Sequence, residues 1–265
     1  MSGKGNIGGY LDLAQVMLYL FWIFFAGLIY YLHRENKREG YPLDSDRTVR
    51  SDGRVKVVGF PPLPAPKTYR LPHGGKLRVP NDLRDQRPLD AVPVAAFPGA
   101  PLEPNGDPML AGIGPGAFAM RSDMPDLTYD GLPKIVPLRI ATDFDLAPGE
   151  RDPRGLPVVG CDGGQAGKVR ELWVDRSECV LRYLELEPDA GSQGASPTAG
   201  SLIPITFARI TARAVRIEAI LGRQFAQVPR TRSPDAVTLL EEDRICAYFG
   251  AGTLYATPDR RESRL

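Results

Sequence analysis

The sequence predicts an α+β protein with one N-terminal transmembrane helix, an extended Pro-rich surface segment, and a mainly antiparallel β-barrel with a C-terminal helix. Three observations predict this order. The stretch from Leu13 to Leu32 contains no Asp, Glu, Lys or Arg, 16 of the 26 prolines lie between Pro42 and Pro133, and short β-type runs follow from Ile135 onward. The predicted divisions are residues 1–10, 11–33, 34–134 and 135–265.

The apolar run has the length of a membrane span. Its twenty residues, at about 1.5 Å of rise each, make a helix of about 30 Å, the thickness of the hydrocarbon core of a bilayer. A cleaved signal peptide would need a shorter apolar region, a basic start and a small-x-small cleavage site, and this sequence has none of them. The other alternative, a buried core helix, is seldom apolar on all faces over five turns.

Basic residues are distributed unequally about the span. Lys4 is the only one before it, whereas a group of five follows closely: Arg34, Lys37, Arg38, Arg47 and Arg50. The positive-inside rule therefore predicts that the N-terminus lies outside the cytoplasm and that the long C-terminal part lies inside it. We also expect Arg34, Lys37 and Arg38 to contact phospholipid head groups.

The composition excludes several classes of function. The net charge of +1 is close to neutral, and no basic patch beyond the cluster that follows the apolar run suggests nucleic-acid binding. The three cysteines are far apart and lack C-x-x-C spacing, so neither a disulfide framework nor a zinc site is indicated. Two histidines, His33 and His73, offer little to a haem or a transition metal. We therefore expect any cofactors to be held by other proteins.

The Pro-rich segment, residues 34–134, should be extended and turn-rich because each proline removes a backbone donor and fixes φ. Apolar residues recur through it, which favours an ordered strap against a partner over a disordered linker. Leu71 to Val79 reads as a tight turn leading into a short strand. Gly112 to Gly116 resembles a dinucleotide loop, but no strand precedes it, and we expect a plain glycine-rich turn.

The C-terminal part, residues 135–265, predicts a small antiparallel barrel or curled sheet. In the strand around Tyr183 we expect Arg182 and Glu185 to face solvent, and residues 188–200 to form a loose hairpin tip. The six predicted strand runs are Ile135 to Ile140, Pro157 to Cys161, Gly167 to Val174, Val180 to Leu186, Ser201 to Ile205, and Ala214 to Ile220.

A soluble helix should follow the barrel. Thr238 and Glu241 form a capping box ahead of Leu239 to Phe249, and we expect Gly250 and Gly252 to end the helix.

A charged turn is the one candidate site. Asp175 and Glu178 lie in the turn after Val174, with Arg182 in the following strand. Two interpretations stay open at this point. The turn is a solvated surface loop, or Asp175 and Glu178 form an enzymatic acid pair, which requires two carboxylates on converging elements around a pocket.

Several strings, in order along almost the whole chain, resemble the H subunit of the purple-bacterial photosynthetic reaction centre. They are Phe21 to Tyr31 in the span, Arg38 to Leu43 just inside it, Pro66 to Thr68 and Leu71 to Gly74 in the strap, then Gly155 to Val158, Ala166 to Val169, Leu172 to Asp175, Thr238 to Asp243 and Gly252 to Ala256.

This resemblance implies a PRC-type barrel in a single-pass protein of the bacterial inner (intracytoplasmic) membrane, with a periplasmic N-terminus. It implies no enzyme and no directly bound pigment. The family caps the L and M subunits, which hold bacteriochlorophyll, bacteriopheophytin, quinones and non-haem iron, and it supports proton uptake to the secondary quinone. Membrane phospholipids, a cytochrome subunit and light-harvesting 1 antenna polypeptides are further candidate partners.

The resemblance also implies roles for individual residues. The family's proton-transfer glutamate corresponds to Glu178, with Asp175 and Arg182 as its neighbours. Family members often carry a histidine pair near the proton entrance, but Thr128 to Lys134 contains no histidine. Asp126 and Asp130 are therefore the candidate carboxylates at the entrance. The alternative class of function is a membrane-tethered adaptor whose barrel binds another protein or an RNA-processing partner, and an enzyme acting at Asp175 and Glu178 is a third.

Overall fold

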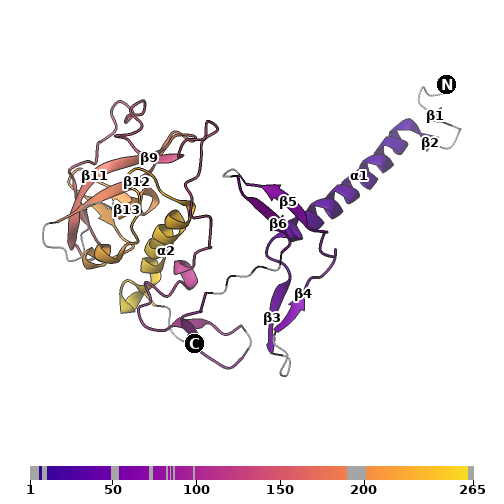
Figure 1. Cartoon of the computed structure of the whole chain (residues 1–265), viewed down its shortest axis with the longest axis horizontal. Helices are drawn as coiled ribbons and strands as arrows, with labels where there is room; N and C mark the ends of the chain where they lie inside the picture. Colours follow the sequence, from indigo (N-terminus) through magenta and orange to yellow (C-terminus); the bar gives the residue numbers. More distant parts are fainter. Residues whose placement is uncertain are drawn as a thin grey trace. The chain divides into compact units, whose positions relative to one another are not determined.

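The computed structural model describes residues 6–7, 11–48, 54–71, 74–81, 83, 85, 87–97, 99–189 and 201–261. The chain divides into two compact units, residues 1–86 with 97–99 and residues 87–96 with 100–265. The first unit contains the long helix α1 and the small strands β3 to β6, and the second contains a curled sheet and helix α2 (Figure 1). Lys4, Arg50, His73 and residues 190–200, which entered the predictions above, lie outside the described residues.

Helix α1 (Leu13–Glu35) forms the predicted span and continues into the 3-10 helix η1 (Asn36–Arg38). Asp12 caps its N-terminus, where its carboxylate accepts a hydrogen bond from the Ala14 N–H at 3.4 Å. None of its residues is buried within the chain. Among the described residues it is the one helix long and apolar enough to cross a membrane. Strands β1 (Asn6–Ile7) and β2 (Leu11–Asp12) pair just before it.

The Pro-rich segment forms three separate two-stranded hairpins. In the first unit β3 (Leu43–Thr48) pairs with β4 (Arg54–Val57), and β5 (Lys67–Arg70) pairs with β6 (Lys76–Val79). In the second unit β7 (Ala91–Pro93) pairs with β8 (Leu102–Pro104). Every strand of a two-stranded hairpin has a free edge, which is the position that proline tolerates. The predicted strand at Lys76–Val79 is confirmed, and its partner β5 is additional.

The second unit is built on a seven-stranded curled sheet. Each of the six predicted runs contains a strand, and Ala208–Ile210 adds one that the sequence pattern did not indicate. The strands are β9 (Ile135–Pro137), β10 (Pro157–Val159), β11 (Gln165–Asp175), β12 (Val180–Pro188), β13 (Ser201–Pro204), β14 (Ala208–Ile210) and β15 (Val215–Ile217).

The sheet is mainly antiparallel, as predicted, but one of its pairings is parallel, so the sheet is mixed. From β10 to β13 each strand is antiparallel to the one before it. The 3-10 helix η3 (Ile205–Phe207) then joins β13 to β14 without a hairpin, so the chain does not reverse there. The hairpin of β14 and β15 turns the chain back, and β15 therefore pairs in parallel with β10. Strand β9 pairs with the end of β11, next to the charged turn.

Strand β11 is half-buried at its start and fully buried at its end. Exposed and buried residues alternate from Lys168 to Arg170, as one-sided burial requires, but Leu172 to Asp175 are all buried. Glu185 on the neighbouring strand β12 is only 3% exposed, so its predicted solvent-facing position is wrong. Its carboxylate instead pairs with Arg139 at 3.0 Å and accepts a hydrogen bond from the Trp173 Nε1–H at 3.0 Å.

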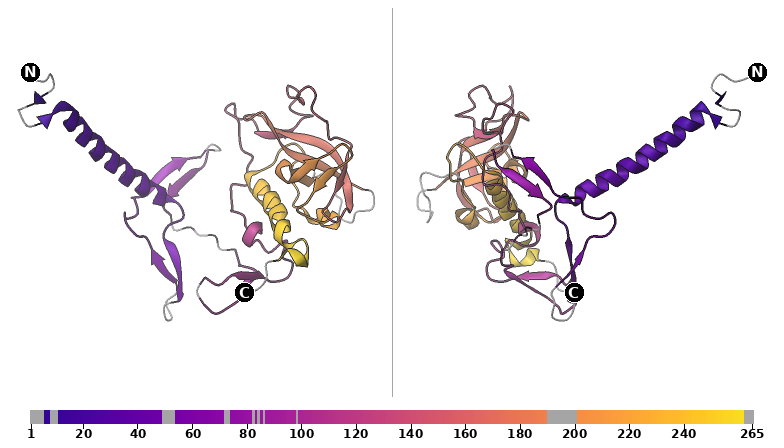
Figure 2. Two further views of the ribbon diagram at one scale, coloured as in Figure 1. Left: turned by 180° about the vertical axis from the view of Figure 1, so that it is seen from behind. Right: turned by 45° about the vertical axis from the view of Figure 1, so that its right-hand side comes forward.

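Helix α2 (Leu239–Tyr255) packs along the curled sheet, as both views of Figure 2 show. The predicted capping box is confirmed, because Thr238 Oγ1 accepts from the Glu241 N–H and the Glu241 carboxylate accepts from the Thr238 N–H. The buried side chains of Ile245, Tyr248 and Phe249 join the core of the sheet. Burying each of these contributes about 2 kcal/mol.

Gly250 and Gly252 do not end α2, because the helix continues to Tyr255. They permit close packing instead. A Cβ on Gly250 would lie 2.4 Å from the Pro115 carbonyl oxygen in the 3-10 helix η2 (Gly114–Gly116), and one on Gly252 would lie 2.4 Å from the Ala219 carbonyl oxygen. Residues 112–116 therefore form the predicted glycine-rich turn, and α2 packs against it.

We predict that Gly252→Ala destabilises the second unit despite the higher helix propensity of alanine. The gain in propensity is about 1 kcal/mol, whereas the backbone displacement costs more, leaving a net loss of about 1–2 kcal/mol. Denaturant unfolding of the full chain in detergent measures this change. Thr253→Ala, at an exposed position of the same helix, is the control. A more stable Gly252→Ala variant would contradict the packing argument.

Candidate functional site

A pocket of about 540 Å³ opens in the second unit where β9, β12 and the first turns of α2 meet. Charged side chains from four separate segments line it. The lining residues are Arg121, Asp126, Lys134, Ile135, Asp175, Leu181, Arg182, Tyr183, Pro204, Ile205, Thr206, Leu239, Glu242, Asp243 and Cys246.

Asp175 is the buried centre of this site. It is the last residue of β11 and is 0% exposed. Its Oδ1 accepts hydrogen bonds from the backbone N–H groups of Ser177 and Glu178 at 2.9 and 3.0 Å, which fixes the turn into β12. Its Oδ2 lies 3.4 Å from Lys134 Nζ and 3.4 Å from Arg182 Nη2. Burial alone would raise the pKa of the Asp175 carboxyl, but these N–H groups and Lys134 outweigh burial, so the pKa lies below its ordinary value.

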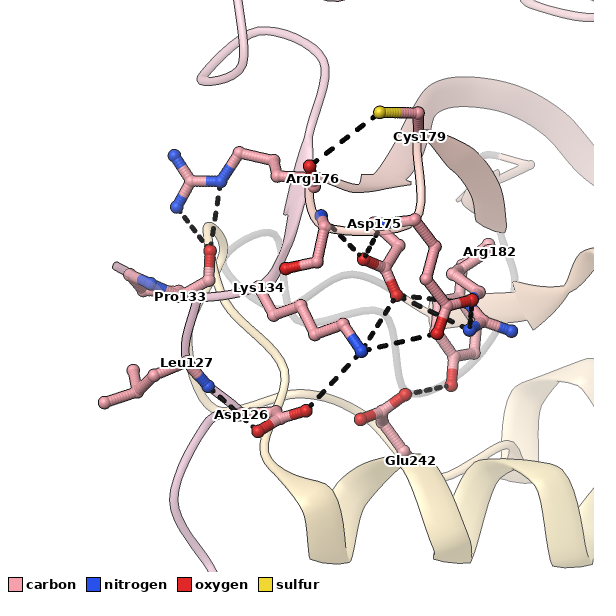
Figure 3. A network of polar contacts seen from close by, with 12 residues as sticks. Asp126, Leu127, Pro133, Lys134, Asp175, Arg176, Cys179, Arg182 and Glu242 are labelled. Carbon is pink, nitrogen blue, oxygen red and sulfur yellow. Dashed lines mark hydrogen bonds and ion pairs between the residues drawn. The ribbon is translucent and has the colours of Figure 1, made fainter. Parts of the chain in front are cut away.

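Lys134 connects three carboxylates. Its ammonium lies between Asp126, Asp175 and the turn that carries Glu178 (Figure 3). Lys134 Nζ lies 3.8 Å from Asp126 Oδ2, 3.4 Å from Asp175 Oδ2 and 3.5 Å from Glu178 Oε1. Burial lowers the pKa of the Lys134 ammonium, but the carboxylates, Asp175 first, outweigh burial, and the pKa lies above its ordinary value. Lys134 therefore stays charged and links the loop before β9 to the turn after β11.

Glu178 lies at the exposed side of the same cluster. Its side chain is 52% exposed, and its Oε2 lies 2.5 Å from Arg182 Nη2. Arg182 also faces the buried Asp175 carboxylate at 3.4 Å. The structure thus brings together Asp175, Glu178 and Arg182, three of the residues singled out from the sequence.

The two carboxylates predicted at the proton entrance differ in position. Asp126 belongs to the cluster through its 3.8 Å contact with Lys134, and its side chain is 48% exposed. Asp130 lies in an exposed turn, and within the described residues its side chain makes no hydrogen bond or ion pair. Of these two carboxylates, Asp126 is the one placed to connect solvent with Lys134 and Asp175.

Glu242 on α2 is a site residue that sequence reasoning missed. It lines the same pocket (Figure 3), and its Oε2 accepts a hydrogen bond from the Tyr183 hydroxyl at 2.8 Å. Burial raises the pKa of the Glu242 carboxyl above its ordinary value. No signal in the sequence marks this residue. A carboxylate in the first turn of a helix is common because it interacts favourably with the helix dipole, so its presence there does not indicate a site.

The predicted lipid-contact residues lie in the first unit. Lys37 is buried, and its ammonium donates to the carbonyl oxygens of Val58 at 2.6 Å and Pro61 at 2.7 Å. Arg38 is also buried. Arg38 pairs with Glu35 through two hydrogen bonds of 2.8 Å and donates to the Ala65 carbonyl oxygen. Arg34 is half-exposed, and its Nε lacks a hydrogen-bond partner among the described residues. The charged groups of Lys37 and Arg38 are thus bound by the protein itself.

The charged pocket is suited to holding and moving protons. It combines carboxyls of different burial with permanently charged cations, and such combinations separate the pKa values of neighbouring acids. Within the described part of the chain no group of three or more His, Cys, Asp and Glu side chains is arranged to hold a metal ion.

Two family models match the chain. The model described as the H-chain N-terminal region of the photosynthetic reaction centre matches residues 5–140. The PRC-barrel domain model matches residues 150–224. The first match covers α1, the Pro-rich segment and β9. The second runs from before β10 into the 3-10 helix η4 (Gly222–Gln227) and identifies the curled sheet as a PRC-type fold.

We predict that Asp175→Asn lowers the free energy of unfolding by about 2–3 kcal/mol at neutral pH, because it leaves Lys134 without its buried partner. The folded pKa of Asp175 is depressed, so its stabilisation is present above the ordinary carboxyl pKa of about 4 and is lost as the pH falls through the folded value. The difference between the two proteins should therefore shrink below about pH 4.

Denaturant unfolding of the full chain at several pH values measures this difference. Asp130→Asn is the matched control, because Asp130 lies outside the cluster. An equal loss of stability in both variants would show that the ion pairs of Asp175 contribute nothing.

Proposed function

The chain belongs to the H-chain family of the photosynthetic reaction centre, whose N-terminal model matches half of its length, and we propose that it caps the L and M subunits on the cytoplasmic side and supports proton uptake to the secondary quinone. As a member of this family the protein is a reaction-centre subunit. The match over the anchor and the Pro-rich segment favours this function over a membrane-tethered adaptor, which needs only the barrel.

The proposed orientation places residues 1–10 in the periplasm and the part of the chain that follows α1 in the cytoplasm. The basic residues that follow α1 support it, since positively charged segments are retained on the cytoplasmic side. In this arrangement the L and M subunits hold the bacteriochlorophylls, bacteriopheophytins, quinones and non-haem iron. Arg34 is the candidate contact to a phospholipid head group, and a cytochrome subunit and light-harvesting 1 polypeptides are candidate neighbours.

One observation carries the proposed role in proton uptake. The described contacts run without interruption from the half-exposed Asp126 through Lys134 to the buried Asp175, and from there through Arg182 to Glu178. A quinone that is reduced twice needs two protons from water, and carboxylates along a polar route can accept and release them. In this proposal Asp126 receives protons at the surface, Glu178 passes them on, and Asp175 and Arg182 set the local field.

We predict a single-pass topology with the large C-terminal part in the cytoplasm. Protease added to sealed inside-out vesicles, which expose the cytoplasmic face, should remove the chain beyond Tyr41. The same protease added to right-side-out vesicles is the control and should leave that part intact. Protection in the inside-out vesicles would reverse the proposed orientation.

We predict that Glu178→Gln slows the proton-coupled second electron transfer to the secondary quinone by roughly 10- to 100-fold, because an amide accepts no proton at neutral pH. The first electron transfer and assembly should be unchanged. Flash-induced quinone reduction and proton uptake in the assembled complex measure both steps.

Glu187→Gln provides the matched control for this variant, because Glu187 lies exposed at the far end of β12, outside the pocket. Second-transfer rates in Glu178→Gln equal to those of the control would mean that the charged turn is a solvated loop.

A further inference from the structure

The carboxyls of the pocket and of the turn after β11 are paired with cations in every case but that of Glu242. Asp126 and Asp175 contact Lys134, and Asp243 contacts Arg121 at 3.5 Å. Glu178 contacts Arg182. Among the described residues Glu242 has no ion pair within 4.0 Å, and its partner is the neutral Tyr183 hydroxyl at 2.8 Å.

This difference in partners separates the proton affinities of Asp175 and Glu242. A cation within a few ångströms stabilises a carboxylate, and the pKa of Asp175 lies below its ordinary value. A phenol hydroxyl also donates to the carboxylate, but it brings no charge to offset burial. For Glu242 burial dominates, and its pKa lies above the ordinary value even though the Tyr183 hydrogen bond lowers it.

We propose that Glu242 is the carboxyl of this pocket that holds an exchangeable proton and supplies it to Glu178 during quinone reduction. This inference rests on the proposed function. It assigns a proton-holding role to a residue of α2, whereas the charged turn after β11 acts as the ionised part of the route.

The transfer conserves protons at each step. The Glu242 carboxylic acid releases one proton across the pocket to the Glu178 carboxylate and becomes a carboxylate itself. Glu178 passes this proton onward and returns to its ionised form. Glu242 then takes a new proton from solvent by way of the half-exposed Asp126.

Charged and titratable groups face Glu242 from each element around it. The loop before β9 brings Arg121 and Asp126, which act in opposite directions, the arginine lowering and the aspartate raising the pKa of Glu242. Strand β12 brings Arg182, which lowers it, and Tyr183. On α2 itself Asp243 is engaged by Arg121. The last group, Cys246, lies one turn further along the same helix.

Infrared titration of the assembled reaction centre tests where the proton resides. A protonated carboxylic acid gives a C=O stretching band that a carboxylate lacks. We expect such a band in the wild type to persist above the pH at which an ordinary carboxyl ionises, and to be lost in Glu242→Gln, whose amide still accepts the Tyr183 hydrogen bond and so preserves the packing. Tyr183→Phe removes a donor to the carboxylate and should move the titration midpoint to higher pH. An unchanged band in Glu242→Gln would overturn the proposal.

Flash kinetics on the same complexes test whether this proton is used. Glu242→Gln should slow the second electron transfer by about 10-fold and flatten its pH dependence around the midpoint, whereas Glu242→Asp should restore most of the rate. Glu187→Gln serves again as the control. Wild-type kinetics in Glu242→Gln alongside slow kinetics in Glu178→Gln would remove Glu242 from the route and leave the proposed function intact. Wild-type kinetics in both variants would refute the route as a whole.

Discussion

The burial of the Asp175 carboxylate is the constraint on which the pocket depends. A charge that is 0% exposed costs several kcal/mol unless it is fully paired. Asp175 meets this requirement with two backbone N–H groups of its own turn and with Lys134 and Arg182. The partners that the Asp175 carboxylate requires therefore fix the shape of the turn, the position of the loop before β9 and the direction of the Arg182 side chain on β12.

Two other carboxyls of the second unit show how the choice of partner decides the role of an acid. Glu185 is nearly as buried as Asp175 and is paired with Arg139, while Trp173 donates a hydrogen bond to it. This ion pair ties β12 to the segment that carries Arg139. Glu242 has a phenol instead of a cation, and its pKa is raised by burial. The two acids thus differ in their partners, a cation for Glu185 and a neutral hydroxyl for Glu242.

In the first unit, cations perform a comparable structural task at the end of α1. Lys37 and Arg38 turn inward and donate to carbonyl oxygens of Val58, Pro61 and Ala65. Prolines in this segment remove backbone donors, so carbonyl oxygens are left without the partners that a regular sheet would supply. The buried cations provide donors in their place. These two basic residues thereby hold the start of the Pro-rich segment against the helix end.

Features that depend on neighbouring residues could be predicted from the sequence. They are the apolar helix α1, the capping box of α2, the strand Lys76–Val79, six strands of the sheet and the charged turn from Asp175 to Glu178. The tertiary structure decided what depends on residues far apart. The parallel pairing of β15 with β10 follows from the path through η3, and the glycines of α2 serve contacts with Pro115 and Ala219. Likewise, Lys134 meets Asp175 across 41 positions, and Glu242 meets Tyr183 across 59. Periodicity and turn chemistry extend over only a few residues, whereas the pKa of an acid is set by whatever the fold brings against it.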